Sequence, residues 1–383
     1  MSASRTHEIA PARRCAYRVI MRVFDSDAFA DRAFRLQAKT LESRDRQLAM
    51  RLAYGTVQRK ATLDHLIVLL AERPTERLEG PILAALRMGL YELLYLDGSP
   101  DYAVLADAVE LAKSQRAHAG GLVNAVLRRA TREARELLAG LDDLSAERAA
   151  IMHSHPRWLA RMWWEALGAE QARALMAANN EPAEVALRVN TLRGQIDDLA
   201  ASLPCPTHRD PDIPEALVLE RALDLEASPQ WRSGALLAQS RAAMLVAHIL
   251  EPQPGERILD LCAAPGGKSS HIAALMQATG EIVAVERSHS RATQMTETLQ
   301  RLGASNVRVE HSDAARPRSD GPFDRVLVDA PCSGLGTLQS NPDLRWRASE
   351  KRIGEMTEAQ SAILKAAGAA VRPGGVLVYC TCT

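Results

Sequence analysis

The sequence lacks the features that mark secreted and membrane proteins. Its six cysteines are scattered rather than arranged as a disulfide framework. No apolar run approaches the length of a membrane span, and the N-terminal segment MSASRTHEIAPARR lacks the apolar core of a signal peptide. We therefore expect a cytoplasmic protein with no membrane partner, and the length of 383 residues predicts two or three domains.

A metal-binding pattern and a net charge are also missing. Cys380 and Cys382 are close-spaced, but no second Cys or His pair at zinc-ligand spacing accompanies them, so we expect no metal site. The net charge is zero, yet residues 1–140 hold 22 Lys and Arg against 17 Asp and Glu, a balance of +5 that leaves −5 for the remainder. A basic N-terminal third fits a polyanionic partner, although on charge alone a solvated helical surface is the better explanation.

The apolar pattern divides the chain into three regions. Residues 1–140 predict a bundle of amphipathic helices, with leucines at helical spacing in PILAALRMGLYELLYL. Residues 141–235 mix helical and strand-like segments with several prolines, which predicts a small α+β connecting subdomain. In residues 236–383, strand-like runs alternate with helices, which predicts a parallel sheet covered on both faces. The strand-like runs are RILDL (257–261), EIVAVE (281–286), VRVE (307–310), FDRVLVDA (323–330) and GVLVYC (375–380).

The first of these strands leads into a loop suited to a nucleotide-like cofactor. The segment LDLCAAPGGKSSHIA (259–273) predicts a strand, a loop of small residues and a helix, whose free N–H groups can bind a ligand. It matches neither the dinucleotide fingerprint nor the phosphate-binding P-loop. Glu286 ends the second strand, where it can accept hydrogen bonds from ribose hydroxyls, and Asp313 follows the third. Either acid alone is better explained as a solvated loop residue, but together with the loop they match an S-adenosylmethionine (AdoMet) pocket.

Two cysteines follow the fourth and fifth strands. Because parallel strands end at one edge of a sheet, we expect Cys332 and Cys382 to lie close together. Carbon 5 of a pyrimidine can be methylated once a thiolate has added to carbon 6, and a second thiol can then assist release of the product. A carboxylic acid at Asp329 could donate a proton to ring nitrogen N3 as negative charge develops.

Inert thiols are the alternative for every cysteine. A buried cysteine most often acts as a small hydrophobic residue, and we assign that role to Cys15, Cys262 and Cys380. A redox pair at 380 and 382 does not suit a reducing cytoplasm. For Cys332 and Cys382 we favour chemistry, because neighbouring Pro and Gly residues predict tight turns at the ends of strands.

These motifs together resemble the RNA cytosine-C5 methyltransferases of the Nop/Sun family. CAAPGGK (262–268) resembles the family's AdoMet loop, DAPCSG (329–334) its motif IV, and TC (381–382) its motif VI. HPRWL (155–159), ANNEP (178–182) and LRVN (187–190) resemble its RNA-facing subdomain. RDRQLAMRLAYGTVQRKATLD (44–64) and GGLVNAVLRR (120–129) resemble a NusB-type helical domain, a fusion that points to members acting on 16S ribosomal RNA.

The resemblance implies an α/β fold and a set of functional residues. We expect a Rossmann-like class I AdoMet methyltransferase domain at 236–383, an α+β RNA-facing subdomain at 141–235, and an all-α NusB-like RNA-binding domain at 1–140. Cys382 matches the nucleophile, Cys332 the thiol that assists release, and Lys268 could reach the target base. The residues implied in cofactor binding are Cys262, Ala263, Ala264, Pro265, Gly266, Gly267, Lys268, Glu286, Asp313 and Asp329. Asp343 and Arg345 could order the loop on the RNA side.

Two positions depart from the family pattern. Position 286 holds Glu where the family commonly has Asp, which keeps the carboxylate and changes only its reach. Family members continue past motif VI with further strands, whereas nothing follows Thr383, so we expect a C-terminally truncated sheet whose fifth strand is a bare edge.

Three functions remain open from the sequence. The first is a monomeric AdoMet-dependent enzyme that forms 5-methylcytosine in 16S ribosomal RNA through a cysteine–cytosine adduct. The second is a non-catalytic RNA-binding or antitermination protein with a degenerate methyltransferase half, against which the intact cysteine pair argues. The third is a small-molecule methyltransferase, which the basic N-terminal region disfavours.

Overall fold

The computed structural model describes residues 8–221 and 223–383 and divides the chain into two compact units. The first unit contains residues up to 182 and the segment 335–348. The second contains residues 183–334 and 349–383. Within the described residues, no helix is long and apolar enough to cross a membrane.

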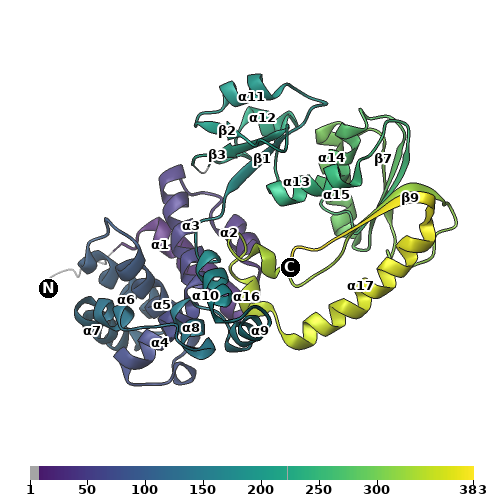
Figure 1. Ribbon diagram of the computed structural model, residues 1–383. Helices are drawn as coiled ribbons and strands as arrows, with labels where there is room; N and C mark the ends of the chain where they lie inside the picture. The colour runs from purple at the N-terminus through teal and green to yellow at the C-terminus, as the bar shows by residue number, and fades with distance from the viewer. Residues whose placement is uncertain (1–7, 222) are drawn as a thin grey trace. The chain divides into compact units, whose positions relative to one another are not determined.

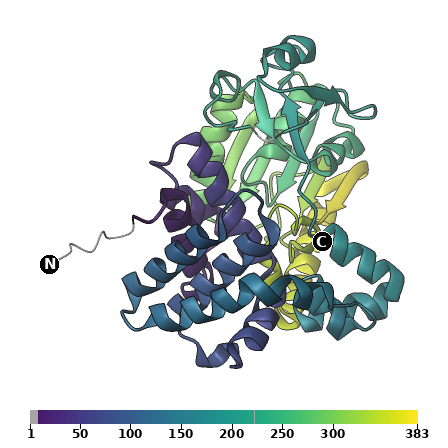
Figure 2. The same ribbon diagram turned by 90° about the vertical axis from the view of Figure 1, so that its left-hand side faces the viewer.

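The first unit is entirely helical, as its leucine spacing predicts. Figure 2 shows its N-terminal helices as a bundle coloured purple to blue. Its elements before residue 182 are α1 (Pro11–Asp25), α2 (Ala30–Gln37), α3 (Ser43–Gln58), α4 (Lys60–Ala71), the short 3-10 helix η1 (Thr75–Arg77), α5 (Gly80–Tyr95), α6 (Asp101–Gln115), α7 (Ala119–Ala139), α8 (Ala146–Met152), α9 (Arg157–Leu167) and α10 (Ala169–Ala178). A proline in the first turn of α5 starts that helix without losing a hydrogen bond.

Apolar side chains from α1 to α7 fill the core of this bundle. One charged cluster is buried among them. Arg13 of α1 pairs with Glu92 of α5 at 2.6 Å and with Asp107 of α6 at 2.8 Å. These ion pairs fix how three helices meet, because a buried charge is stable only when it is paired.

A distant segment completes the first unit. It contains η2 (Leu335–Thr337) and α16 (Leu344–Arg347). Arg345 is fully buried and donates hydrogen bonds to the carbonyl oxygens of Ser154 (2.9 Å) and Asn179 (3.2 Å). Trp346 Nε1 donates to the Val57 carbonyl at 2.7 Å. The segment that the sequence assigns to a loop on the RNA side is therefore anchored in the helical unit by buried hydrogen bonds.

The second unit begins with a small antiparallel sheet in the order β2-β3-β1-β4. Its strands are β1 (Val185–Val189), β2 (Thr207–Arg209), β3 (Ala216–Leu219) and β4 (Leu236–Ala238), with the short helices α11 (Ile196–Ser202) and α12 (Pro229–Arg232) between them. The mixed sequence pattern predicts one α+β subdomain over 141–235, but the helices α8, α9 and α10 of that region belong to the first unit, and only its later part contributes to this small sheet.

A five-stranded parallel sheet forms the rest of this unit, in the order β7-β6-β5-β8-β9. The strands are β5 (Arg257–Leu261), β6 (Glu281–Glu286), β7 (Val307–His311), β8 (Phe323–Asp329) and β9 (Val371–Cys380). The chain passes from β5 to β6 and β7 on one side and then to β8 and β9 on the other. This reversal lies between β5 and β8, which is where doubly wound sheets bind their ligands.

Helices cover both faces of the large sheet, as the strand–helix alternation predicts (Figure 1). The helices α13 (Arg241–Leu250), α14 (Gly267–Leu275) and α15 (His289–Leu302) pack on one face. The long helix α17 (Glu350–Ala370) packs on the other through Ile363, Ala367 and Ala370. Consecutive residues of β5, such as Ile258 and Leu259, belong to opposite cores, so the strands are apolar on both sides.

Candidate active site

The loop between β5 and α14 turns sharply at the carboxyl edge of the sheet. Cys262 and Gly266 both have positive φ, at 64° and 96°. A Cβ at Gly266 would lie 3.1 Å from the Met295 side chain, so the position favours glycine on both conformational and steric grounds. Arg291 donates to the Ala264 carbonyl at 2.8 Å and holds the loop from outside. The first N–H groups of α14 then face the sheet edge without a partner inside the helix.

A cavity of about 400 Å³ lies beside this loop. Cys262, Glu286, Asp313 and Pro331 all line it, so it joins the ends of four strands. The volume falls in the range of roughly 300–1,000 Å³ that small-molecule sites occupy. Burial raises the pKa of Cys262 to about 12, which keeps this cysteine a neutral thiol in the cavity wall.

Glu286 is held in place for ligand contact. The side chain is buried at the tip of β6, and its Oε1 accepts a hydrogen bond from the Ser288 N–H at 2.7 Å. Arg291 lies 3.5 Å from Oε2. Asp313 Oδ1 accepts from the Ala315 N–H at 3.0 Å, which fixes the second acid after β7. Both predicted cofactor acids therefore face one cavity from neighbouring strand ends.

The structure brings Cys332 and Cys382 into contact. The pairing of β8 with β9 places Asp329 opposite Cys380. The segments that follow the two strands, and that carry Cys332 and Cys382, therefore leave the sheet at the same edge. The two Sγ atoms are 3.0 Å apart, which is a contact between free thiols rather than a disulfide. The backbone N–H of Cys382 also donates to Cys332 Sγ at 3.3 Å.

The two thiols share their protons unequally. The Cys382 thiol donates toward Cys332, and this hydrogen bond lowers the pKa of Cys332 to about 5 despite partial burial. The same contact raises the pKa of Cys382. The pair therefore loses one proton easily and holds the second tightly, as coupled groups do.

Lys268 and Asp329 form an ion pair next to the thiols. Lys268 Nζ donates to Asp329 Oδ2 at 2.7 Å, and Cys380 Sγ lies 3.4 Å from the other carboxylate oxygen. Burial alone lowers the pKa of Lys268, but the Asp329 carboxylate outweighs burial and raises it. Burial raises the pKa of Cys380 to about 12, so this third cysteine stays a neutral thiol.

Sequence reasoning missed one acid in this group. Asp260 on β5 is fully buried, and its Oδ2 accepts a hydrogen bond from Ser269 Oγ of α14. Burial, reinforced by the charge of Asp329, raises the pKa of Asp260 to about 7 even though the Ser269 bond opposes the shift. Its position inside RILDL was the available signal, because a carboxylate in an otherwise apolar strand requires a partner.

A second missed residue connects the small sheet to the loop. Arg188, in the LRVN segment, is buried on β1 and donates to the Gly267 carbonyl at 2.6 Å and to Ser270 Oγ at 2.7 Å. A third hydrogen bond, of 2.7 Å, reaches Gln239 Oε1. The first turn of α14, which carries Lys268, is therefore held by a guanidinium from a different sheet.

A parallel sheet with this strand order and this pocket defines a Rossmann-like methyltransferase. Matches to described families cover successive parts of the chain: the NusB family at residues 10–132, an RsmF/B-like ferredoxin-like domain at 155–226, and the 16S rRNA methyltransferase RsmB/F at 247–383. The chain belongs to the 16S rRNA methyltransferase RsmB/F family.

Known proteins resemble the chain over most of its length. A probable ribosomal RNA small subunit methyltransferase B of Synechocystis sp. is 36% identical to it, over 97% of this chain and 85% of the relative. The crystal structure of PH0851 covers 99% of this chain and 87% of that one with a TM-score of 0.82 and 25% identity. A methyltransferase homolog protein from Pyrococcus horikoshii covers 62% of this chain and 77% of that one, with a TM-score of 0.56 and 30% identity. The predicted fold class and family are confirmed.

Proposed function

We propose that the protein transfers a methyl group from AdoMet to carbon 5 of a cytosine in 16S ribosomal RNA, through a covalent cysteine–cytosine adduct. The observation that carries this proposal is the contact of two thiols at 3.0 Å beside a cofactor-sized cavity. Family membership supports methyl transfer, and the name of the Synechocystis relative supports small-subunit ribosomal RNA as substrate. The thiol pair supports carbon 5 as the target, because that carbon reacts only after its neighbour has bonded to a nucleophile.

The cavity fits AdoMet by its chemistry. Glu286 offers a carboxylate for the ribose hydroxyls, and Asp313 offers one for the adenine amino group. The loop of residues 262–268 supplies backbone N–H groups at a helix N-terminus but does not match the phosphate-binding pattern GxxxxGK[ST], because position 262 is Cys, and this suits a cofactor without pyrophosphate. When bound, AdoMet supplies a methyl group attached to a positively charged sulfur.

Cys382 is the proposed nucleophile and Cys332 the proposed base. The thiolate of Cys332 accepts the proton of Cys382 across their 3.0 Å contact, so Cys382 can attack carbon 6 as a thiolate. Formation of the carbon–sulfur bond makes carbon 5 nucleophilic. Cys332 must then release its proton to solvent before it can remove the carbon-5 proton. Loss of that proton restores the double bond and expels Cys382.

The Lys268–Asp329 pair is proposed to stabilise charge on the ring. Addition of a thiolate places negative charge at the N3 side of the pyrimidine. A carboxylic acid at Asp329 is the donor that the sequence suggested, and its contact with Lys268 supports a refined assignment in which the ammonium holds the proton. In this assignment the Lys268 ammonium offers the hydrogen at the place where charge develops and the Asp329 carboxylate positions it. Fixed donors of this kind give large rate effects.

The helical region 1–140 is proposed to bind the RNA. Its match to the NusB family and its excess of five positive charges support this assignment. Phosphate contacts release bound counterions, so RNA affinity should fall steeply as salt rises. Binding that ignored salt would favour a small-molecule substrate instead.

A methyl-transfer assay tests the proposal. The protein is incubated with methyl-labelled AdoMet and unmodified 16S ribosomal RNA, which is then digested to nucleosides. We expect label in 5-methylcytosine. Label in another nucleoside would disprove the chemistry, whereas RNA binding without any label would favour the non-catalytic RNA-binding function.

A further inference from the structure

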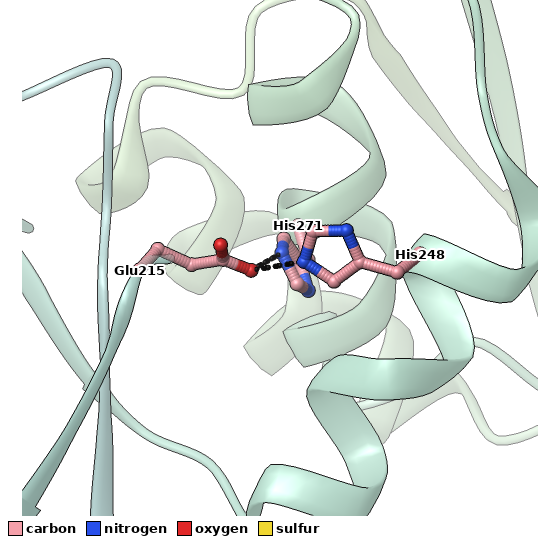
Figure 3. Close-up of side chains that lie close together, drawn as sticks. All are labelled: Glu215, His248 and His271. Atoms are coloured by element: carbon pink, nitrogen blue, oxygen red, sulfur yellow. Dashed lines mark hydrogen bonds and ion pairs between the residues drawn. The ribbon is translucent and has the colours of Figure 1, made fainter. Parts of the chain in front are cut away.

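A second cluster of reactive side chains lies away from the thiols. Glu215 immediately precedes β3, His248 lies near the end of α13, and His271 lies on α14. Figure 3 shows the three side chains pointing toward one another from these separate elements. One ligand atom of each lies within 4.8 Å of the others. Neither the proposed reaction nor the family assignment uses these residues.

The cluster is buried on one side and open on the other. The His271 side chain is 1% exposed and that of Glu215 is 7% exposed, while His248 is 30% exposed. His248 Nε2 lies 2.8 Å from Glu215 Oε1, and His271 Nε2 contacts the same oxygen. An ion or a solvent molecule could therefore enter past His248.

His271 has few polar partners for a buried imidazole. Its Nε2 contacts Glu215 Oε1, the same oxygen that contacts His248, and its Nδ1 has no hydrogen-bond partner. Buried polar groups with incomplete hydrogen bonding in native proteins call for an explanation. A metal ion held between the two Nε2 atoms and the shared carboxylate oxygen would explain why these three side chains converge.

We propose that Glu215, His248 and His271 bind a divalent transition-metal ion of the zinc class. Two imidazole nitrogens and one carboxylate oxygen form a donor set that zinc accepts, with the fourth position left for water. Hard ions such as Mg²⁺ and Ca²⁺ favour oxygen ligands instead. Ligand atoms around tetrahedral zinc lie about 3.3 Å apart, so the contacts of Glu215 Oε1 with the two histidines must lengthen when an ion binds between them.

The surrounding charges set the strength of this site. The positive charge of Arg188 acts on His271. Arg188 therefore also repels a cation that binds between the three side chains. We therefore expect weaker binding than at four-ligand structural zinc sites.

Metal binding would connect three elements of the second unit. Glu215 immediately precedes β3 of the small sheet, His248 lies on α13, and His271 lies on α14, the helix that also carries Lys268. A shared ion would cross-link the sheet to this helix and raise the thermal stability of the unit, because it binds only the folded state. The role is structural, so the inference does not depend on the proposed methylation.

The test must separate this cluster from the thiols, which also bind zinc. We would use tag-free, metal-stripped protein carrying Cys332→Ala, Cys380→Ala and Cys382→Ala, and titrate it with ZnCl₂ by calorimetry and with CoCl₂ by visible absorption. We expect one ion per chain, a cobalt spectrum typical of four-coordination with nitrogen and oxygen ligands, and a higher melting temperature with zinc.

Two further variants in this background locate the site. His248→Gln removes the most exposed ligand and should abolish binding while the protein remains folded. His289→Gln is the matched control, because His289 makes an edge-to-face contact with His311, as His248 does with His271, with ring centroids 5.4 Å apart in both pairs, and it should leave binding unchanged. No binding to the parent variant, or equal binding to both variants, would overturn the proposal and leave the cluster a hydrogen-bonded triad.

Discussion

Two clusters of buried charge in this chain differ in what surrounds them. In the helical unit, Arg13 pairs with Glu92 and Asp107, and the side chains of these residues are 10%, 0% and 3% exposed. In the second unit, Lys268 pairs with Asp329 where their side chains are 18% and 32% exposed. The first cluster is closed and fully paired, as a structural cluster must be. The second opens toward thiols at a sheet edge, where a substrate can use its charges.

The largest effect should come from breaking the closed cluster. Arg13→Met removes the cation that pairs with two buried carboxylates and should lower the free energy of unfolding by about 3–5 kcal/mol. Chemical denaturation followed by circular dichroism measures this loss. Arg132→Met is the control, because Arg132 is 68% exposed and lies 4.0 Å from its acid, so its loss should cost less than about 1 kcal/mol. Equal losses in Arg13→Met and Arg132→Met would show that burial does not make the ion pairs of Arg13 more important for stability than an exposed pair.

Breaking the open cluster should affect catalysis more than stability. We expect Asp329→Asn to lower kcat by about 10²–10³-fold, because a fixed charge beside the reacting ring is lost. Asp324→Asn, at the other end of the same strand, should keep the wild-type kcat, since Asp324 pairs with Arg372 far from the thiols. If both variants lost kcat equally, the loss would come from disturbing strand β8 and would not support a role of Asp329 beside the substrate.

A smaller effect is expected in the cavity. Glu286→Gln keeps the shape but removes the charge proposed to bind ribose hydroxyls, and it should weaken AdoMet binding by about 10-fold, the scale of one charge-assisted hydrogen bond. Calorimetry with AdoMet measures the change. Glu281→Gln removes an acid from the start of the same strand, where it pairs with Arg257 and Arg308, and should leave the affinity unchanged. Unchanged affinity in Glu286→Gln would place the cofactor elsewhere.

The thiol pair predicts a pH dependence. Because the pKa of Cys332 is lowered to about 5, its thiolate should be present above that pH and should be lost as pH falls through about 5. Alkylation of Cys332 by iodoacetamide, followed by mass spectrometry, should show this inflection. In Cys382→Ala the thiol donor is gone, so the inflection should move up toward the ordinary cysteine value. The same inflection in both proteins would contradict the shared-proton description.

Much of the fold could be predicted from the sequence because local patterns determine it. The runs RILDL and EIVAVE coincide with β5 and β6, and the helical stretch 289–302 coincides with α15. The region 141–235 was predicted less completely, since three of the four strands in its small sheet are only three or four residues long. Such strands are fixed by pairing with distant segments, and that information is not local.

The candidate site, too, could be predicted only where its residues follow from local sequence patterns. Cys332 and Cys382 could be paired in advance, because parallel strands necessarily end at one edge. Arg345 could not be placed, since its buried partners belong to a helical unit more than a hundred residues earlier. The cluster of Glu215, His248 and His271 follows no ligand spacing in the sequence. The expectation of no metal site therefore rested on motifs, whereas the proposal of one rests on proximity in the fold.

The central claim is that Cys382 bonds to the cytosine and that Cys332 is needed to release it. The most direct measurement is a denaturing gel of Cys332→Ala incubated with AdoMet and 16S ribosomal RNA. A protein–RNA species that survives denaturation in this variant, and is absent when Cys382→Ala is added, is the predicted result. A covalent species that persists without Cys382 would contradict the account.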